Sequence, residues 1–153
     1  MNKTILLGLI IMISIFSLSA KTRKKNIDNL PLMNTKWVLE EVFETVVTHN
    51  NDTAFITFSE NYKFSGNLSC NLFFGEFSYG KKRLKLDYFG ATKKYCKDMS
   101  LEELFLKAIK LDKFTYFINR NTMFFFHKKN MVCKFEGKLI VNENLEENHE
   151  DSN

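Results

Sequence analysis

The sequence predicts an α+β fold: a mostly antiparallel, strongly curved sheet or open barrel of about eight strands with one packed helix. Three observations favour it. Short apolar runs follow one another with turn residues between them. The chain contains 16 Phe and one Pro, a composition typical of pleated, half-buried surfaces. One segment, which begins near Ser100, has the apolar spacing of an amphipathic helix.

The apolar runs place eight strands, five before the helix and three after it. We expect them at residues 36–43, 54–58, 63–68, 72–79, 83–88, 113–118, 122–127 and 131–136. The segment 49–52 (HNND) breaks the chain after the first strand. Consecutive hairpins imply antiparallel pairing. Strong curvature would remove most exposed edges, and the helix would then cover the apolar opening.

The helix is predicted from its start signal and its apolar stripe. Ser100 and Glu103 have the spacing of a capping box, in which each side chain bonds the backbone amide of the other residue. A stripe for core packing follows at helical spacing: Leu101, Leu104, Phe105, Ala108 and Leu111.

The first 20 residues have the pattern of a secretory signal peptide. Lys3 is followed by an apolar or small run at 5–18 and by small residues. The run is shorter than the roughly 20 residues of a spanning helix, although an uncleaved anchor stays open. We expect cleavage after Ser19 or Ala20 and an exported mature protein, periplasmic or secreted. A basic lead-in at 21–33, a folded domain at 34–137 and an acidic tail at 138–153, expected to be disordered, follow.

The charge distribution restricts the choice of partners. The formal net charge is +4, and the tail after Asn142 contains acids but no Lys or Arg. A basic body could meet nucleic acid or anionic lipid. Export argues against nucleic acid, and a solvated β surface explains the scattered lysines better. No stable membrane anchor is expected after cleavage, and the oligomeric state stays open.

The segment 67–77 (NLSCNLFFGEF) contains residues that a plain core strand does not need. Gly75 stands among large aromatic residues, where it permits a bend, a bulge or close approach of a neighbouring backbone or ring. Asn71 lies at a strand junction, where its side chain can hold a turn. We favour structural roles for both. The expected core cluster is Trp37, Phe73, Phe77, Leu104 and Phe135.

Several of these residues together resemble the signature of the META domain family, which includes the heat-shock protein HslJ. The matching positions are Trp37, Gly66, Cys70, Asn71, Phe73, Gly75, Thr92 and Cys96. The resemblance spans about 32–137, with departures at Ser69 and at Lys94-Tyr95. It implies a compact β-rich META/HslJ-like domain with one helix, an envelope or secreted location, and a link to stress or antibiotic tolerance. It implies no catalytic residues, and the usual lipid-attachment Cys is missing here.

No other pattern in the chain points to catalysis, a cofactor or a metal. His49, His127 and His149 share no metal-ligand spacing with Cys or carboxylates. A pair of Cys70 or Cys133 with His127 stays open. We expect a non-enzymatic protein that acts through an envelope or secreted protein partner. The alternative is a lipocalin-like carrier of an apolar small molecule, which would need a cavity between helix and sheet instead of a filled interior.

The three cysteines of the mature chain can form one disulfide. Export permits a bridge. Cys133 alternates with Phe135 in a strand and suits a buried thiol. Cys70 and Cys96 stand at irregular points and match the family signature, so we hypothesise a Cys70–Cys96 bridge. Three free thiols remain the alternative.

Export predicts a specific mass for the mature protein. Protein recovered from the extracytoplasmic fraction should lack the first 19 or 20 residues, because the apolar run is followed by small residues. Intact-mass spectrometry of that fraction checks this. Protein that retains Met1 and sediments with membranes would contradict it.

Overall fold

The computed structural model describes residues 28–48 and 54–140. The signal peptide, most of the basic lead-in, the 49–52 break and all but the first residues of the acidic tail therefore lie outside the described residues.

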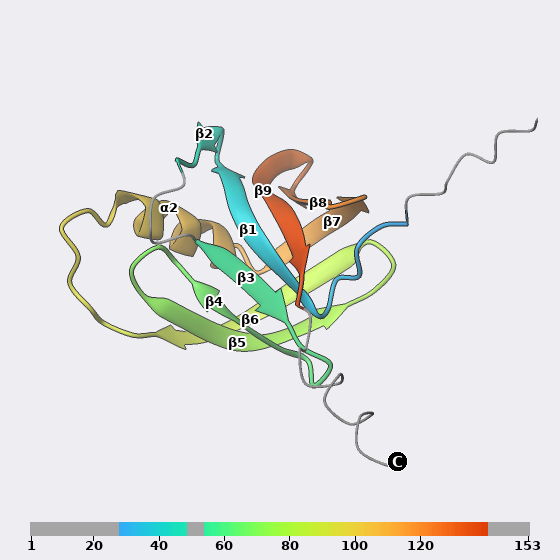
Figure 1. Cartoon of the computed structure of the whole chain (residues 1–153), viewed down its shortest axis with the longest axis horizontal. Helices are drawn as coiled ribbons and strands as arrows, with labels where there is room; N and C mark the ends of the chain where they lie inside the picture. The colour runs from blue at the N-terminus through green and yellow to red at the C-terminus, as the bar shows by residue number, and fades with distance from the viewer. Residues whose placement is uncertain (1–27, 49–53, 141–153) are drawn as a thin grey trace, which may run out of the picture.

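The strands close into one antiparallel barrel. The elements are β1 (Thr35–Val42), β2 (Thr45–Val46), β3 (Phe55–Phe58), β4 (Lys63–Asn67), β5 (Leu72–Tyr79), β6 (Arg83–Ala91), α2 (Ser100–Ile109), β7 (Lys113–Asn119), β8 (Thr122–His127) and β9 (Asn130–Leu139). Strands β3 to β9 pair with their neighbours in chain order, and β1 pairs with both β3 and β9 (Figure 1). The predicted curved, mostly antiparallel sheet is confirmed, and the sheet is closed.

The short strand β2 was not expected from the sequence. It has two residues and pairs only with the end of β1, through Glu41↔Val46 and Val42↔Thr45. Phe43 and Glu44 between them both have positive φ. The turn therefore depends on two residues in the left-handed region, and Phe and Glu are not residue types that predict such a conformation.

Aromatic side chains fill the barrel interior. Phe105 of α2 lies 5.6 Å from Phe73 and 6.0 Å from Phe135, measured between ring centroids. Trp37 and Phe77 are also buried, so four of the five expected core residues are confirmed. The fifth, Leu104, is only partly buried against the core. The helix thus contributes the Phe105 ring to the core, together with Ala108 and Ile109.

The helix begins differently from the prediction. Met99 occupies the N-cap position and makes no capping bond with its side chain. Ser100 is the first helical residue, and its hydroxyl donates to Asp98 Oδ1 at 2.6 Å. That bond, with one from the Ser100 amide, lowers the pKa of Asp98. The capping box is therefore wrong, because an upstream carboxylate takes the Ser100 hydroxyl.

The buried face of α2 is also turned relative to the predicted stripe. It consists of Glu102, Phe105, Ala108 and Ile109. Leu101, Leu104 and Leu111 pack only partly against the core. No helix in the described part of the chain is long and apolar enough to cross a bilayer.

Two glycines allow neighbouring strands to pack closely. A Cβ on Gly75 would collide with the Asp87 carbonyl and the Phe64 ring. A Cβ on Gly66 would collide with the Phe55 carbonyl and the Phe73 ring. The close approach expected at Gly75 is thus present, next to a register shift between β5 and β6.

The pairing between β6 and β7 is short. It comprises three residue pairs, Arg83↔Thr115, Leu84↔Phe114 and Lys85↔Lys113. Two further backbone bonds flank these pairs: the Leu86 amide donates to the Asp112 carbonyl at 2.7 Å, and the Tyr116 amide donates to the Lys82 carbonyl at 3.0 Å. We call this contact the β6–β7 seam.

Replacement of Phe77 by Ala should strongly destabilise the fold. The Phe77 ring is buried and lies 4.9 Å from the Phe58 ring in an edge-to-face contact. The cavity should lower the free energy of unfolding by about 3–5 kcal/mol in a denaturant titration. Phe117→Ala is the control, because its ring is 55% exposed. Equal unfolding midpoints for Phe77→Ala and the parent would contradict the packing.

Candidate functional site

Two features of the molecule concentrate polar or charged groups: a buried cluster around Asn71, and a groove on the outer surface over the β6–β7 seam.

The Asn71 cluster joins the β4–β5 turn to the first turn of α2. Asn71 is 2% exposed and Glu102 is 7% exposed. The Asn71 backbone amide donates to Glu102 Oε2 at 2.8 Å, and Nδ2 donates to Glu102 Oε1 at 2.9 Å. The carboxylate is therefore taken out of water with donors facing both oxygens, as a buried charge requires.

The second half of the Asn71 amide binds the segment before the helix. Its Oδ1 accepts from the Thr92 hydroxyl at 2.8 Å and from the Lys94 amide at 2.7 Å. Thr92 Oγ1 in turn accepts from the Leu72 amide at 3.1 Å. We expected Asn71 to hold a local turn, but its side chain bonds residues more than 20 positions away.

The Cys70–Cys96 disulfide lies beside this cluster. The bridge is present, with its Cα atoms 6.3 Å apart. It ties the residue before Asn71 to the loop that leads into α2. The same junction is therefore held covalently and by a buried hydrogen-bond network.

The structure separates the signature residues into two groups. Cys70, Asn71, Thr92 and Cys96 meet at the α2 junction. The others belong to the barrel wall and core: Trp37, Gly66, Phe73 and Gly75. Among the latter, Trp37 Nε1 donates to the Leu32 carbonyl at 2.9 Å.

Sequence reasoning missed the role of Glu102. In the sequence Glu102 stands in the first turn of the predicted helix, next to Glu103. The available signal was its position one turn before Phe105 and two turns before Ile109, which are buried on the same face. A carboxylate on an inward helix face requires a buried donor.

The polar atoms of the cluster are used internally. Within the described residues, every buried side-chain nitrogen or oxygen has a hydrogen-bond partner. The same residues contain no group of three or more His, Cys, Asp or Glu side chains suited to a metal ion. The cluster therefore serves as a lock between helix and barrel.

The remaining cysteine is enclosed in the core. Cys133 is a free, fully buried thiol, and burial raises its pKa well above the ordinary range. Cys70 is oxidised in the bridge. Neither sulfur is thus available as the exposed thiolate that a Cys–His pair with His127 would need.

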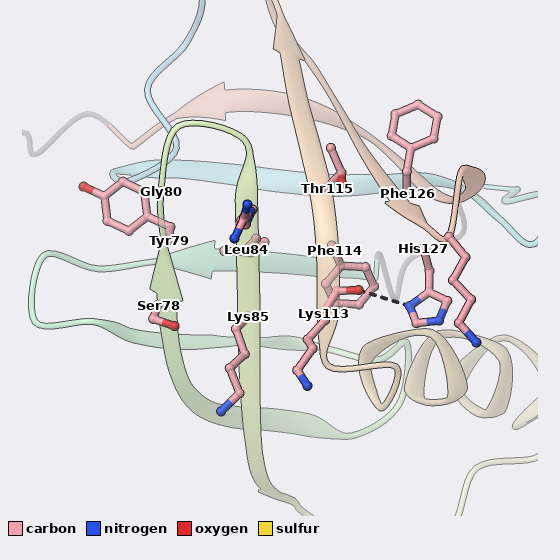
Figure 2. A pocket seen from close by; sticks show the side chains of 12 residues that line it. Ser78, Tyr79, Gly80, Leu84, Lys85, Lys113, Phe114, Thr115, Phe126 and His127 are labelled. Carbon is pink, nitrogen blue, oxygen red and sulfur yellow. Dashed lines mark hydrogen bonds between the residues drawn. The ribbon is translucent and has the colours of Figure 1, made fainter.

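The groove lies on the outer surface over the β6–β7 seam and measures about 640 Å³ (Figure 2). Its basic residues are Arg83, Lys85, Lys113, His127 and Lys128, and its aromatic residues include Tyr79 and Phe126. Side chains of Lys85 and Lys113 extend in the same direction from neighbouring strands. We call this feature the basic groove.

Local bonds fix the frame of the basic groove. The His127 Nδ1 atom lies 3.1 Å from the Lys113 carbonyl oxygen (Figure 2). Lys85 pairs with Asp87 at 2.6 Å, and this hydrogen bond raises the pKa of Lys85. The Tyr116 hydroxyl donates to the Gly80 carbonyl at 3.3 Å, and burial raises the pKa of Tyr116.

The comparison with family models settles the family. The model of the META domain matches residues 30–138, which is more than half of the chain. The chain belongs to the META domain family. The resemblance inferred from Cys70, Asn71 and the other signature residues is thereby confirmed.

Two solved structures share this META domain fold. One NMR structure has a TM-score of 0.57 and 23% sequence identity, and the alignment covers 68% of this chain and 89% of that chain. An NMR structure of a protein from Burkholderia xenovorans has a TM-score of 0.56 and 19% identity, covering 70% and 83%. At these identities the likeness shows the fold. No curated protein matches the chain.

Glu102→Gln should loosen the helix from the barrel. The Gln amide group would put a donor where Asn71 also donates. Two donors would then face each other without an acceptor, which should lower the free energy of unfolding by about 1–3 kcal/mol in a denaturant titration. Glu103→Gln, the exposed neighbour on the same helix, should change it by less than about 0.5 kcal/mol. Identical stabilities of the two variants would show that the Asn71–Glu102 contact contributes nothing.

Proposed function

We propose that this META domain protein is an exported, non-enzymatic binding module. It supports tolerance of envelope stress or antibiotics by interacting with a component of the envelope, in the periplasm or outside the cell. The observation that carries the proposal is the Cys70–Cys96 disulfide at the α2 junction.

The disulfide supports export because such bonds persist in oxidising compartments and are rare in a reducing cytosol. The apolar run at residues 5–18 supports it independently, since its length and flanks suit a signal peptide.

The use of polar groups favours binding over catalysis. Asn71 and Glu102, which are both buried, use their donors and acceptors for each other and for Thr92 and Lys94. A catalytic group needs a lone pair or proton directed at a substrate. The barrel wall thus acts as a rigid support for a binding surface.

The barrel interior does not favour the carrier alternative. Phe105 of α2 inserts between Phe73 and Phe135, where an apolar ligand would have to lie. Trp37 and Phe125 are also fully buried there. The basic groove is the better candidate for contact, because it is open on the outer surface.

The proposal is tested by separating export from folding. A strain lacking the gene should be challenged with an envelope-directed antibiotic while it produces the full chain, a chain lacking residues 2–20, or Cys70→Ser/Cys96→Ser. The full chain should restore survival, whereas the chain lacking residues 2–20 should not, because it would stay in the cytoplasm. The double Ser variant should restore less survival than the full chain, because the loop that the disulfide closes contributes roughly 3–4 kcal/mol to the free energy of unfolding.

Thiol labelling accompanies the survival assay. In denatured protein from cells that produce the full chain, one thiol, Cys133, should react without reductant and three should react after reduction. Equal survival with and without residues 2–20 would refute an extracytoplasmic role. Equal survival with and without the gene, at normal protein levels, would refute a role in tolerance.

A further inference from the structure

We propose that the basic groove binds an amphiphilic anion, a molecule with one apolar chain that ends in a carboxylate or phosphate. This inference rests on the proposed function, because it names the class of molecule that the binding module takes. It is argued from the charges, the register and the aromatic side chains of the groove.

The groove contains more positive charge than its surroundings neutralise. Four Arg or Lys side chains line it, at positions 83, 85, 113 and 128. Lys85 pairs with Asp87. Within the described part of the chain, no acidic side chain forms an ion pair with Arg83, Lys113 or Lys128. These three cations are free to bind an anion.

The register brings two of the cations together. Lys85 and Lys113 are direct partners across the β6–β7 seam, and both face outward over the groove (Figure 2). Like charges directly opposite each other destabilise a strand pair. Asp87 pairs with Lys85 and, among the described residues, leaves Lys113 without an acidic partner, so an acidic group placed beside the two ammonium groups would supply Lys113 with a charge-assisted hydrogen bond.

A second pair of opposed lysines provides a comparison within the same barrel. Lys36 and Lys138 are partners between β1 and β9. The Lys36 ammonium lies 4.1 Å from the centroid of the Phe55 ring, and neither lysine lines the basic groove. Two lysines that face each other across a strand pair therefore indicate an anion site only where they also line a groove.

The aromatic side chains extend the groove as an apolar track. Phe126 lines the groove, its ring lies 6.4 Å from that of Phe124, and the Phe124 ring lies 6.5 Å from that of Phe117. Phe117 is 55% exposed. Register pairs Phe117 with Phe124 on the outer face of β7 and β8. The stems of the lysines add further apolar surface.

The combination selects one chemical class. An inorganic anion would leave the aromatic track uncovered, and a neutral apolar molecule would bury cations without a partner. The volume of about 640 Å³ falls within the usual range of small-molecule sites. An acidic head between Lys85 and Lys113 with its chain along Phe126 satisfies both requirements.

The test measures binding of decyl phosphate, kept below its micelle concentration, by titration calorimetry with the full mature chain. Decyl phosphate should bind, whereas inorganic phosphate and decyl maltoside should bind at least about tenfold more weakly. Lys113→Glu should weaken decyl phosphate by at least about tenfold, since it removes a charge-assisted bond and adds repulsion. Its thermal midpoint should not fall, because Glu at 113 would face Lys85.

Lys138→Glu is the matched control, with the same charge reversal opposite another lysine. Its affinity for decyl phosphate should stay within about twofold of the parent. An equal loss of affinity in both variants would show that the effect comes from net charge, and it would contradict the proposed site. If inorganic phosphate or decyl maltoside bound as tightly as decyl phosphate, the claim that the ligand is an amphiphilic anion would be wrong.

Two further outcomes separate this inference from the function on which it rests. Binding of phosphatidylglycerol vesicles, or of an acidic peptide, without binding of decyl phosphate would overturn the inference in favour of a macromolecular partner. Absence of all binding would also overturn it. In either case, restored survival by the exported chain would leave the proposed function standing.

Discussion

The contact between Asn71 and Glu102 determines how the helix closes the barrel. Aromatic rings alone could pack in several orientations, because burial of apolar area is not directional. The carboxylate of Glu102 requires donors on both oxygens, and the amide groups of Asn71 supply them at 2.8 and 2.9 Å. This requirement fixes the rotation of α2 and so brings Phe105 between Phe73 and Phe135. The adjacent disulfide holds the same junction in the unfolded chain.

The parts of the fold that depend on local pattern could be predicted. Alternation in β5 predicted Phe73 and Phe77 in the core, and Leu84 and Leu86, which alternate in the same way in β6, are also buried. The eight main strands follow from such runs and the turns between them. Closure by β1 and β9 could not be predicted, because the pairing of distant strands depends on curvature accumulated along the whole sheet.

The candidate sites divide in the same way. The signature residues Cys70 and Cys96 could be paired because they match a known family pattern. Ser100 was misassigned because its competing acceptor, Asp98, lies upstream of the capping motif. Glu102 escaped notice because its partner is 31 positions away. The basic groove combines residues of β5 to β8, and no single segment carries its pattern.

Closure of the barrel has a consequence for the order of events during synthesis. Thr35 pairs with Leu139, so the first wall strand completes its contacts only after nearly the entire domain has emerged. Contacts between residues so far apart in sequence slow folding. Strands that are consecutive in the chain can pair earlier, so the closure of β9 on β1 is the last step of assembly.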